Sequence, residues 1–154
     1  MSRRDQIKMT DQEITDFLQG RHTLNVATFN HDGTIHLVAM WYGILDDGTI
    51  GFETFARSQK VKNLRRDPRV TALVEDGDTY SELRGVELVG TMEVVDDAEV
   101  LMAIARSVLA RYHPEVAEAD RQAVAEMVIK KRVALLLRPE KRVSWDHRKL
   151  EGGY

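Results

Sequence analysis

The segment "SQKVKNLRRDPRV", residues 58–70, combines a helix start, an inward apolar pair and a helix stop. Ser58 is a residue type that favours the N-cap position, where its hydroxyl can accept a hydrogen bond from a free amide of the first turn. Val61 and Leu64 lie three residues apart and predict an inward face. Asp67-Pro68 ends the helix, because the residue before a proline avoids the α region. The pattern therefore predicts a short helix near residues 58–66.

The same segment carries an unusual excess of positive charge. Six cations face one acid, Asp67, between positions 57 and 69: Arg57, Lys60, Lys62, Arg65, Arg66 and Arg69. A helix N-terminus presents unpaired N–H groups and a partial positive charge, so it attracts anions. We expect a phosphate to bind Ser58, Lys60 and the helix amides, with Arg57 and Asn63 nearby. Nucleic-acid binding and ordinary solvated charge are the alternatives.

The flanking sequence is rich in strand-forming residues. Asp-Gly pairs at 32–33, 47–48 and 76–77 supply the positive φ that tight hairpins require. The gaps between the first strands are too short for crossover helices, which favours antiparallel pairing. We expect a mainly β fold of six or seven antiparallel strands that closes into a barrel. The strand-forming runs are TLNVATF, TIHLVAMWYGI, TIGFETF, RVTALVE, GVELVGTMEVV, RVALLLR and RVSWDH, the last two separated by Pro139.

Three further helices complete the expected single domain over residues 1–154. Thr10 and Glu13 form a capping box before a helix at 11–19, and Gly20 occupies a typical C-cap position. Apolar residues at helical spacing predict helices at 97–113 and 120–130, the former with Asp96 or Asp97 as N-cap.

The run "TIHLVAMWYGI", residues 34–44, is apolar on both faces. Ile35, Leu37, Ala39 and Trp41 alternate with Val38, Met40, Tyr42 and Ile44. A barrel strand needs one apolar face for the core, so the second face needs a cover. A partner subunit, a flat aromatic ligand or one of the chain's own helices would each supply it.

The composition of the chain argues against several classes of protein. The chain of 154 residues has no cysteine, which excludes disulfides and thiolate sites and fits a reducing cytoplasm. No apolar run approaches the ~18 residues of a membrane span. The net charge of –3 argues against a nucleic-acid binder. A second basic segment, 121–149, could meet residues 57–69 and hold a polyanionic small molecule. No catalytic pair or histidine metal spacing is visible.

The chain resembles the pyridoxamine-phosphate-oxidase-like split β-barrel proteins. The resemblance rests on "TFARSQKVKNLRRDPRVTALV" at 54–74 and extends over nearly the whole sequence. Together with "MWY" at 40–42 and "SWDHRKL" at 144–150, these motifs are most similar to the F420-dependent reductase branch. The resemblance implies a split-barrel homodimer with the cofactor at the subunit interface.

The resemblance also implies a cofactor site and a reaction. The phosphate of coenzyme F420, or of FMN in other relatives, would lie at Thr54, Arg57, Ser58, Lys60 and Asn63. The ring would lie along Val38, Met40 and Trp41, with Arg84 and Trp145 reaching it from one subunit or its partner. Ser58 replaces an arginine that some relatives carry. The implied activity is hydride transfer between the deazaflavin C5 and an activated double bond, with no dedicated catalytic residue. An FMN-binding oxidoreductase and a non-catalytic F420- or tetrapyrrole-binding protein are the alternatives.

Overall fold

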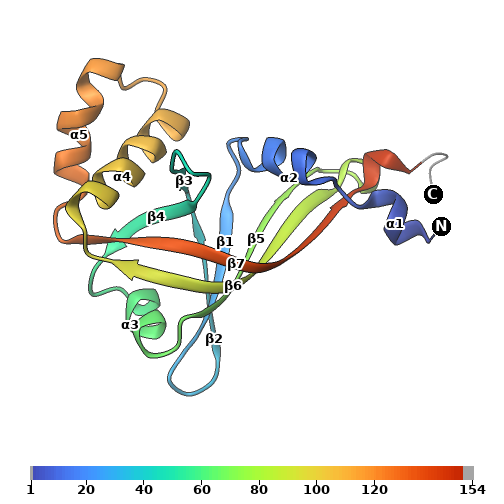
Figure 1. The fold of residues 1–154 in the computed structure, drawn as a ribbon, viewed down its shortest axis with the longest axis horizontal. Helices are drawn as coiled ribbons and strands as arrows, with labels where there is room; N and C mark the ends of the chain where they lie inside the picture. The colour runs from blue at the N-terminus through green and yellow to red at the C-terminus, as the bar shows by residue number, and fades with distance from the viewer. Residues whose placement is uncertain (1, 151–154) are drawn as a thin grey trace.

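The computed structural model describes residues 2–150, which form one curled antiparallel sheet with helices around it (Figure 1). The seven strands follow the spatial order β2-β1-β5-β6-β7-β4-β3. Their bounds are β1 Leu24–Phe29, β2 Ile35–Met40, β3 Gly43–Ile44, β4 Ile50–Phe55, β5 Arg69–Asp76, β6 Arg84–Val95 and β7 Arg132–Asp146. The predicted antiparallel, mainly β fold is confirmed. β2 and β3 form its two edges, so the sheet is an open half-barrel.

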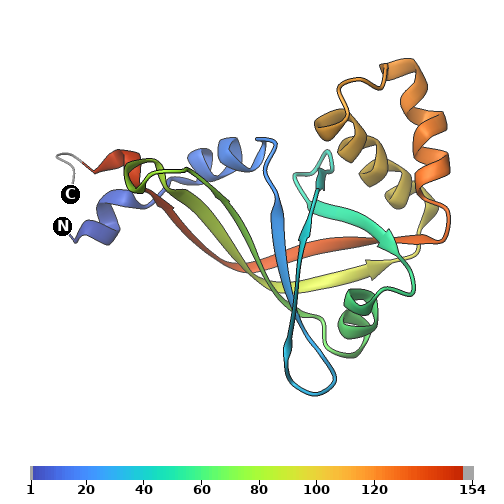
Figure 2. The same ribbon diagram turned by 180° about the vertical axis from the view of Figure 1, so that it is seen from behind.

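Helices cover the half-barrel and the far end of its long strands. Figures 1 and 2 show α4 beside β3 and β4, α5 packed against α4, α3 after β4, and α1 beside the end of β7. The helices are α1 Arg3–Ile7, α2 Asp11–Leu18, α3 Gln59–Arg66, α4 Ala98–Tyr112 and α5 Arg121–Val128, with short 3-10 turns at Tyr80–Glu82, Glu118–Asp120 and His147–Lys149. None of the helices in the described part of the chain has the length and apolar character needed to cross a membrane.

Local sequence signals explain most of these boundaries. Thr10 and Glu13 form the predicted capping box of α2, and Asp97 caps α4 through the amides of Glu99 and Val100. Gly33 and Gly48 both have a φ of 84°, as the Asp-Gly turns require. The core lies inside the curl, where Leu24, Phe52 and Leu135 have no exposed surface. The short helix α1 was not predicted from the sequence.

Two local predictions were wrong. Gly20 does not cap α2 in the left-handed conformation, because Gln19 is the C-cap and is right-handed. A Cβ at position 20 would lie 2.4 Å from the ring Nε2 of His22, so a larger residue there would require the His22 side chain to move. Pro139 does not divide the last two runs, which form the single strand β7.

A β-bulge lets β7 continue through Pro139. The register between β6 and β7 shifts at Val89/Gly90, and Gly90 lies opposite Pro139. A Cβ on Gly90 would lie 2.2 Å from the Arg138 carbonyl oxygen, so the close backbone approach requires glycine. The bulge places the proline where the ladder is already interrupted.

Candidate functional site

The N-terminus of α3 forms a corner with an unpartnered hydroxyl. Ser58 is the N-cap residue, as predicted, but its side chain makes no cap hydrogen bond. Its Oγ is buried and has no hydrogen-bond partner within the described structure. The expected satisfaction of a first-turn amide by Ser58 is therefore wrong. Both the hydroxyl and the first-turn amides need another partner, which an anionic group could provide.

Lys60 points back from the first turn of α3 toward β4. Its Nζ donates a hydrogen bond of 3.0 Å to Oγ1 of Thr54, whose side chain is buried. Burial, helped by the positive charge of Arg132, lowers the pKa of the Lys60 ammonium. None of the ion pairs among residues 2–150 includes Lys60. The ammonium is therefore partly desolvated without an anionic partner, which favours a bound anion.

The two basic segments of the sequence meet beside this corner. Arg57 and Lys131 line a cavity of about 530 Å³ together with Phe55 and Ala56. The amide of Ala56 donates to the carbonyl of Lys131 at 3.0 Å, which holds the two backbones together. Lys131 was not predicted as a site residue. Lys131 belongs to the second basic segment, which was noted in the sequence. No sequence pattern could predict that this segment lies beside Arg57.

Asn63 anchors α3 instead of facing the corner. The residue has no exposed surface. Its side-chain nitrogen donates to Oγ1 of Thr28 at 3.1 Å and to Oδ1 of Asn30 at 3.0 Å, and its oxygen accepts from Gln59. Direct contact between Asn63 and a ligand is not available in this structure. Asn63 fixes the helix, and with it Ser58 and Lys60, against the end of β1.

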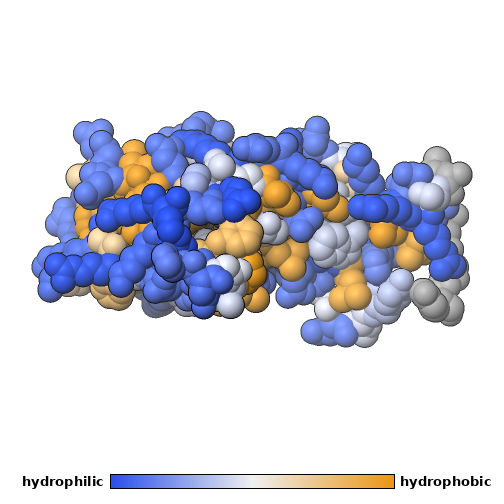
Figure 3. All heavy atoms as spheres, turned by 90° about the horizontal axis from the view of Figure 1, so that it is seen from below, coloured by the Kyte–Doolittle hydropathy of each residue, from blue (hydrophilic) through white to orange (hydrophobic). Residues whose placement is uncertain are grey.

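The apolar strand β2 has one covered and one open face. Ile35 and Leu37 are 54% and 65% exposed. Val38 and Met40 point the other way and pack against the main core. Within the described residues, Ile35 and Leu37 therefore lack the cover that the alternation predicts for the second face. Figure 3 shows that apolar side chains interrupt the hydrophilic surface on the lower face of the molecule.

Trp41 connects the end of β2 to α4. Its ring stacks on Tyr112, with the ring centres 5.0 Å apart and the planes 6° from parallel. The side chain is still 49% exposed. Trp41 and Met40 line a cavity of about 300 Å³ together with Thr23, Ala39, Glu53, Val108 and Arg132. Two of the three predicted ring-binding residues thus share one cavity, whereas Val38 does not line it.

Glu53 and Arg132 add an unpredicted charged pair to this cavity. The closest ion-pair atoms, Nη1 of Arg132 and Oε1 of Glu53, are 3.8 Å apart. Oε2 of Glu53 and Nε of Arg132 are buried without partners among the described residues. Burial raises the pKa of the Glu53 carboxyl, and the Arg132 charge only partly offsets this effect. The guanidinium of Arg132 also covers the Phe55 ring at 4.4 Å, which links the two cavities.

Arg84 and Trp145 lie at the opposite end of the molecule from α3. Arg84 begins β6 and pairs with Asp76 at 2.6 Å, and Trp145 packs on Gly85. The α3 end of the sheet lies near Met92, whose amide bonds to Pro68. Arg84 and Met92 are eight residue steps apart on β6, about 26 Å along the strand. One chain therefore does not bring these two residues to the corner, so their predicted role requires a partner subunit.

Comparison with known proteins places these features in a family. The family model described as pyridoxamine 5'-phosphate oxidase matches residues 10–146. The chain is similar to the conserved hypothetical protein Rv2991 from Mycobacterium tuberculosis, with 42% identity over 100% of this chain and 95% of that one, at a TM-score of 0.91. It is also similar to a structure described as an F420 reductase, with 27% identity, coverage of 82% and 93%, and a TM-score of 0.59.

 A heme binding protein from Mycobacterium smegmatis shares the fold alone. It is 17% identical over 88% of this chain and 57% of that protein, at a TM-score of 0.62. At this level of identity the likeness carries no information about ligands. No curated protein matches the chain.

The family match and the geometry agree on the same segments. The matched region, residues 10–146, contains the half-barrel, the N-terminus of α3 and the strand β2. The chain therefore belongs to the pyridoxamine 5'-phosphate oxidase family.

Proposed function

We propose that this protein is an F420-dependent oxidoreductase that transfers a hydride between the deazaflavin C5 and an activated double bond of a small organic substrate. The observation that carries the proposal is the unpartnered Ser58 hydroxyl at the start of α3, beside a Lys60 ammonium that has no anionic partner among residues 2–150. A phosphate at this corner would satisfy both groups and the helix amides together. The 27% identity to a structure described as an F420 reductase supports the choice of cofactor.

The planar part of the cofactor would lie toward β2. Among residues 2–150, that strand is an edge of the sheet and pairs with β1 alone, so its outer N–H and C=O groups have no strand partner there. Polar atoms on the rim of a ring can bind such groups, while Met40 and Trp41 supply apolar contact beside them. The corner and the strand edge therefore offer different surfaces to the two ends of one molecule.

The protein's own contribution would be binding, orientation and exclusion of water. When bound, a reduced deazaflavin supplies the hydride. Lys60, Arg57 and Ser58 would hold the phosphate, and Asn63 would keep their helix in place. Trp41 would limit access of water to the reacting face. Among the residues that line the cavity at Trp41, Glu53 is the one acid, and its raised pKa lets it retain a proton near neutral pH more readily than an exposed glutamate.

The same proposal includes a homodimer with the cofactor at the subunit interface. The exposed row of Ile35, Leu37 and Ala39 leaves a face of β2 that a second copy can cover. Arg84 and Trp145, remote from α3 in one chain, would reach the site from the partner.

Parallel titrations with F420 and FMN test the cofactor. We expect the purified protein to be colourless and to bind added F420 more tightly than FMN, as followed by cofactor fluorescence. A screen of enones, quinones and tetrapyrroles with reduced F420 should then reveal oxidation of the cofactor. Co-purified FMN with no F420 affinity would contradict the proposal, and F420 binding without any turnover would indicate a carrier.

A further inference from the structure

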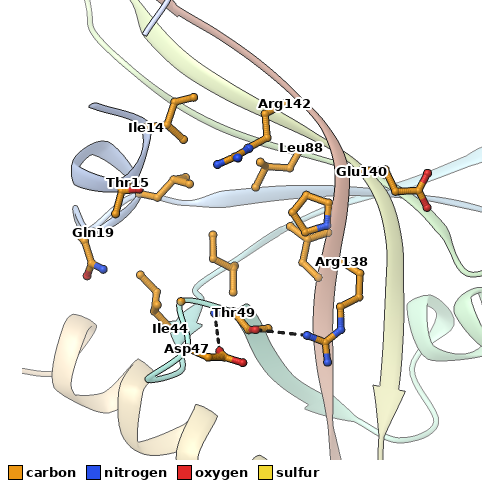
Figure 4. Close-up of a pocket in the computed structure, with 15 residues that line it drawn as sticks. Ile14, Thr15, Gln19, Ile44, Asp47, Thr49, Leu88, Arg138, Glu140 and Arg142 are labelled. Atoms are coloured by element: carbon orange, nitrogen blue, oxygen red, sulfur yellow. Dashed lines mark hydrogen bonds between the residues drawn. The ribbon is translucent and has the colours of Figure 1, made fainter. Parts of the chain in front are cut away.

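A separate cavity lies on the other side of the half-barrel, between α2, the turn from β3 to β4, and β7 (Figure 4). Its volume is about 490 Å³, within the range of roughly 300–1,000 Å³ that is common for small-molecule sites. We call it the α2–β7 cavity. It shares no lining residue with the cavities at Arg57 or Trp41.

The floor of the α2–β7 cavity is apolar. Leu18, Ile50 and Leu137 line it and belong to the main core cluster, with at most 9% of each residue exposed. Leu88 continues this surface on β6. Such a floor favours a hydrocarbon body and disfavours a polar ligand such as a nucleotide, whose groups would lose hydration without gaining partners.

One cation at the rim is available to a ligand. Arg142 points across the cavity toward α2 (Figure 4). Its one ion pair within the described structure is with Asp11 at 3.9 Å, beyond hydrogen-bond distance, and the Asp11 side chain is 90% exposed. An ion pair this long and exposed contributes little and is readily exchanged.

The other charged groups at the rim are already occupied or face elsewhere. Arg138 pairs with Glu93 at 3.0 Å and donates to Thr49 at 3.4 Å. The Asp47 carboxylate accepts from the amide of Thr49 at 2.9 Å. Glu140 points away from the cavity on the far side of β7 (Figure 4). Arg142 is therefore the charged side chain that points across the cavity, and its planar fork of donors matches a carboxylate.

We propose that the α2–β7 cavity binds a small amphipathic carboxylate of the medium-chain fatty-acid class, with its carboxylate on Arg142 and its hydrocarbon chain over Leu18, Ile50 and Leu137. This site is independent of the proposed cofactor site. The apolar floor supplies affinity, and Arg142 selects the anionic end.

Calorimetric titration with dodecanoate below its micellar concentration tests both parts of this site. The wild-type protein should bind dodecanoate with a stoichiometry of about one per chain, bind methyl dodecanoate at least about tenfold more weakly, and show no heat with acetate. Arg142→Gln should weaken dodecanoate binding by about tenfold or more. Lys141→Gln is the matched control, because Lys141 is the exposed neighbour on β7 and does not line the cavity. It should bind as the wild type does.

A second variant tests the position of the hydrocarbon chain. Thr15 is exposed on α2 and lines the cavity, so Thr15→Trp should fill the entrance and abolish dodecanoate binding without removing core packing. Melting temperatures of all three variants close to that of the wild type would show that each one folds. Absence of dodecanoate binding to the wild type, as expected if a second copy covers the cavity, would overturn the proposal. Equal binding by Arg142→Gln, by Thr15→Trp or of the methyl ester would overturn it as well.

Discussion

At the scale of single residues, the buried carboxyl of Glu53 sets a pH dependence. Burial raises the pKa of this group in the folded protein above its ordinary value of 4.5, and the nearby Arg132 reverses only part of the shift. A carboxyl with a raised folded-state pKa binds its proton more tightly in the folded chain than in the unfolded chain. Its contribution to stability is therefore fully present below pH 4.5 and is lost as the pH rises through the folded-state pKa.

Replacement of Glu53 by the neutral Gln should remove the decrease in stability that accompanies ionisation of the Glu53 carboxyl. We expect Glu53→Gln to be more stable than the wild type at pH 7, with the difference shrinking toward pH 4, as measured by urea unfolding at both values. Glu87→Gln, at a partly exposed position on β6 that lines none of the three cavities discussed above, is the control. A variant that is less stable at pH 7 would mean that the 3.8 Å pair with Arg132 outweighs the cost of burial.

The positions of single side chains could be predicted from the sequence only where they depend on local spacing. The sequence predicted Ser58 as N-cap and Lys60 near the helix start, because both follow from local spacing. It did not predict that the Ser58 hydroxyl lacks a partner or that Asn63 binds Thr28 and Asn30, because those contacts depend on β1. Glu53 and Arg132 were missed for the same reason, since they lie on different strands, β4 and β7.

At the scale of elements, Arg111 joins α4 to the end of α2. Its guanidinium donates to the carbonyl oxygens of Leu18, Gln19, Gly20 and Tyr42 at 2.7 to 3.2 Å. It also lies 4.6 Å from the centre of the Tyr42 ring. One side chain thus satisfies the carbonyls that a helix C-terminus leaves free, a role that we assigned to Gly20 from the sequence.

Removal of the Arg111 guanidinium should destabilise the folded protein. Arg111→Ala should lower the free energy of unfolding by about 2–4 kcal/mol, because several part-buried carbonyls would lose a charged donor. Urea unfolding gives the size of the effect, and amide hydrogen exchange should show faster opening of α2. Arg106→Ala, at an exposed position on the same helix, should change stability by less than about 0.5 kcal/mol. Equal effects of the two variants would show that α2 does not depend on Arg111.

Strand and helix positions were predicted well where one local signal was sufficient. The capping box of α2, the Asp97 cap of α4 and the Asp-Gly turns fall where the sequence places them. The continuous strand β7 was missed because the effect of Pro139 depends on Gly90, a residue on β6 about fifty positions earlier in the chain.

At the scale of the whole molecule, the open face of β2 predicts self-association. We expect a homodimer in which a second copy covers Ile35, Leu37 and Ala39, since Leu37 alone is 65% exposed. Leu37→Glu should shift the protein to a monomer in sedimentation velocity, because it would bury an unpaired charge in the interface. It should also weaken F420 binding if the site is shared between subunits.

A substitution outside the exposed row separates this effect from a general loss of folding. His31→Glu changes an exposed turn residue between β1 and β2 and should leave the dimer intact. A wild-type protein that sediments as a monomer at micromolar concentration would contradict the proposed assembly. The sequence predicted the need for a cover from two-residue periodicity, but the identity of the cover depends on a second molecule.

The most direct test of the central claim is the affinity for F420 of Lys60→Ala compared with Lys62→Ala. Lys60 points to Thr54 at the corner, whereas Lys62 is exposed two residues further along the same helix. If the phosphate binds at the start of α3, Lys60→Ala should raise the Kd by about 10- to 100-fold, which corresponds to the loss of one charge-assisted hydrogen bond. Lys62→Ala should change it by less than threefold, about 0.6 kcal/mol. Equal affinities of Lys60→Ala and the wild type would show that the phosphate of the cofactor lies elsewhere.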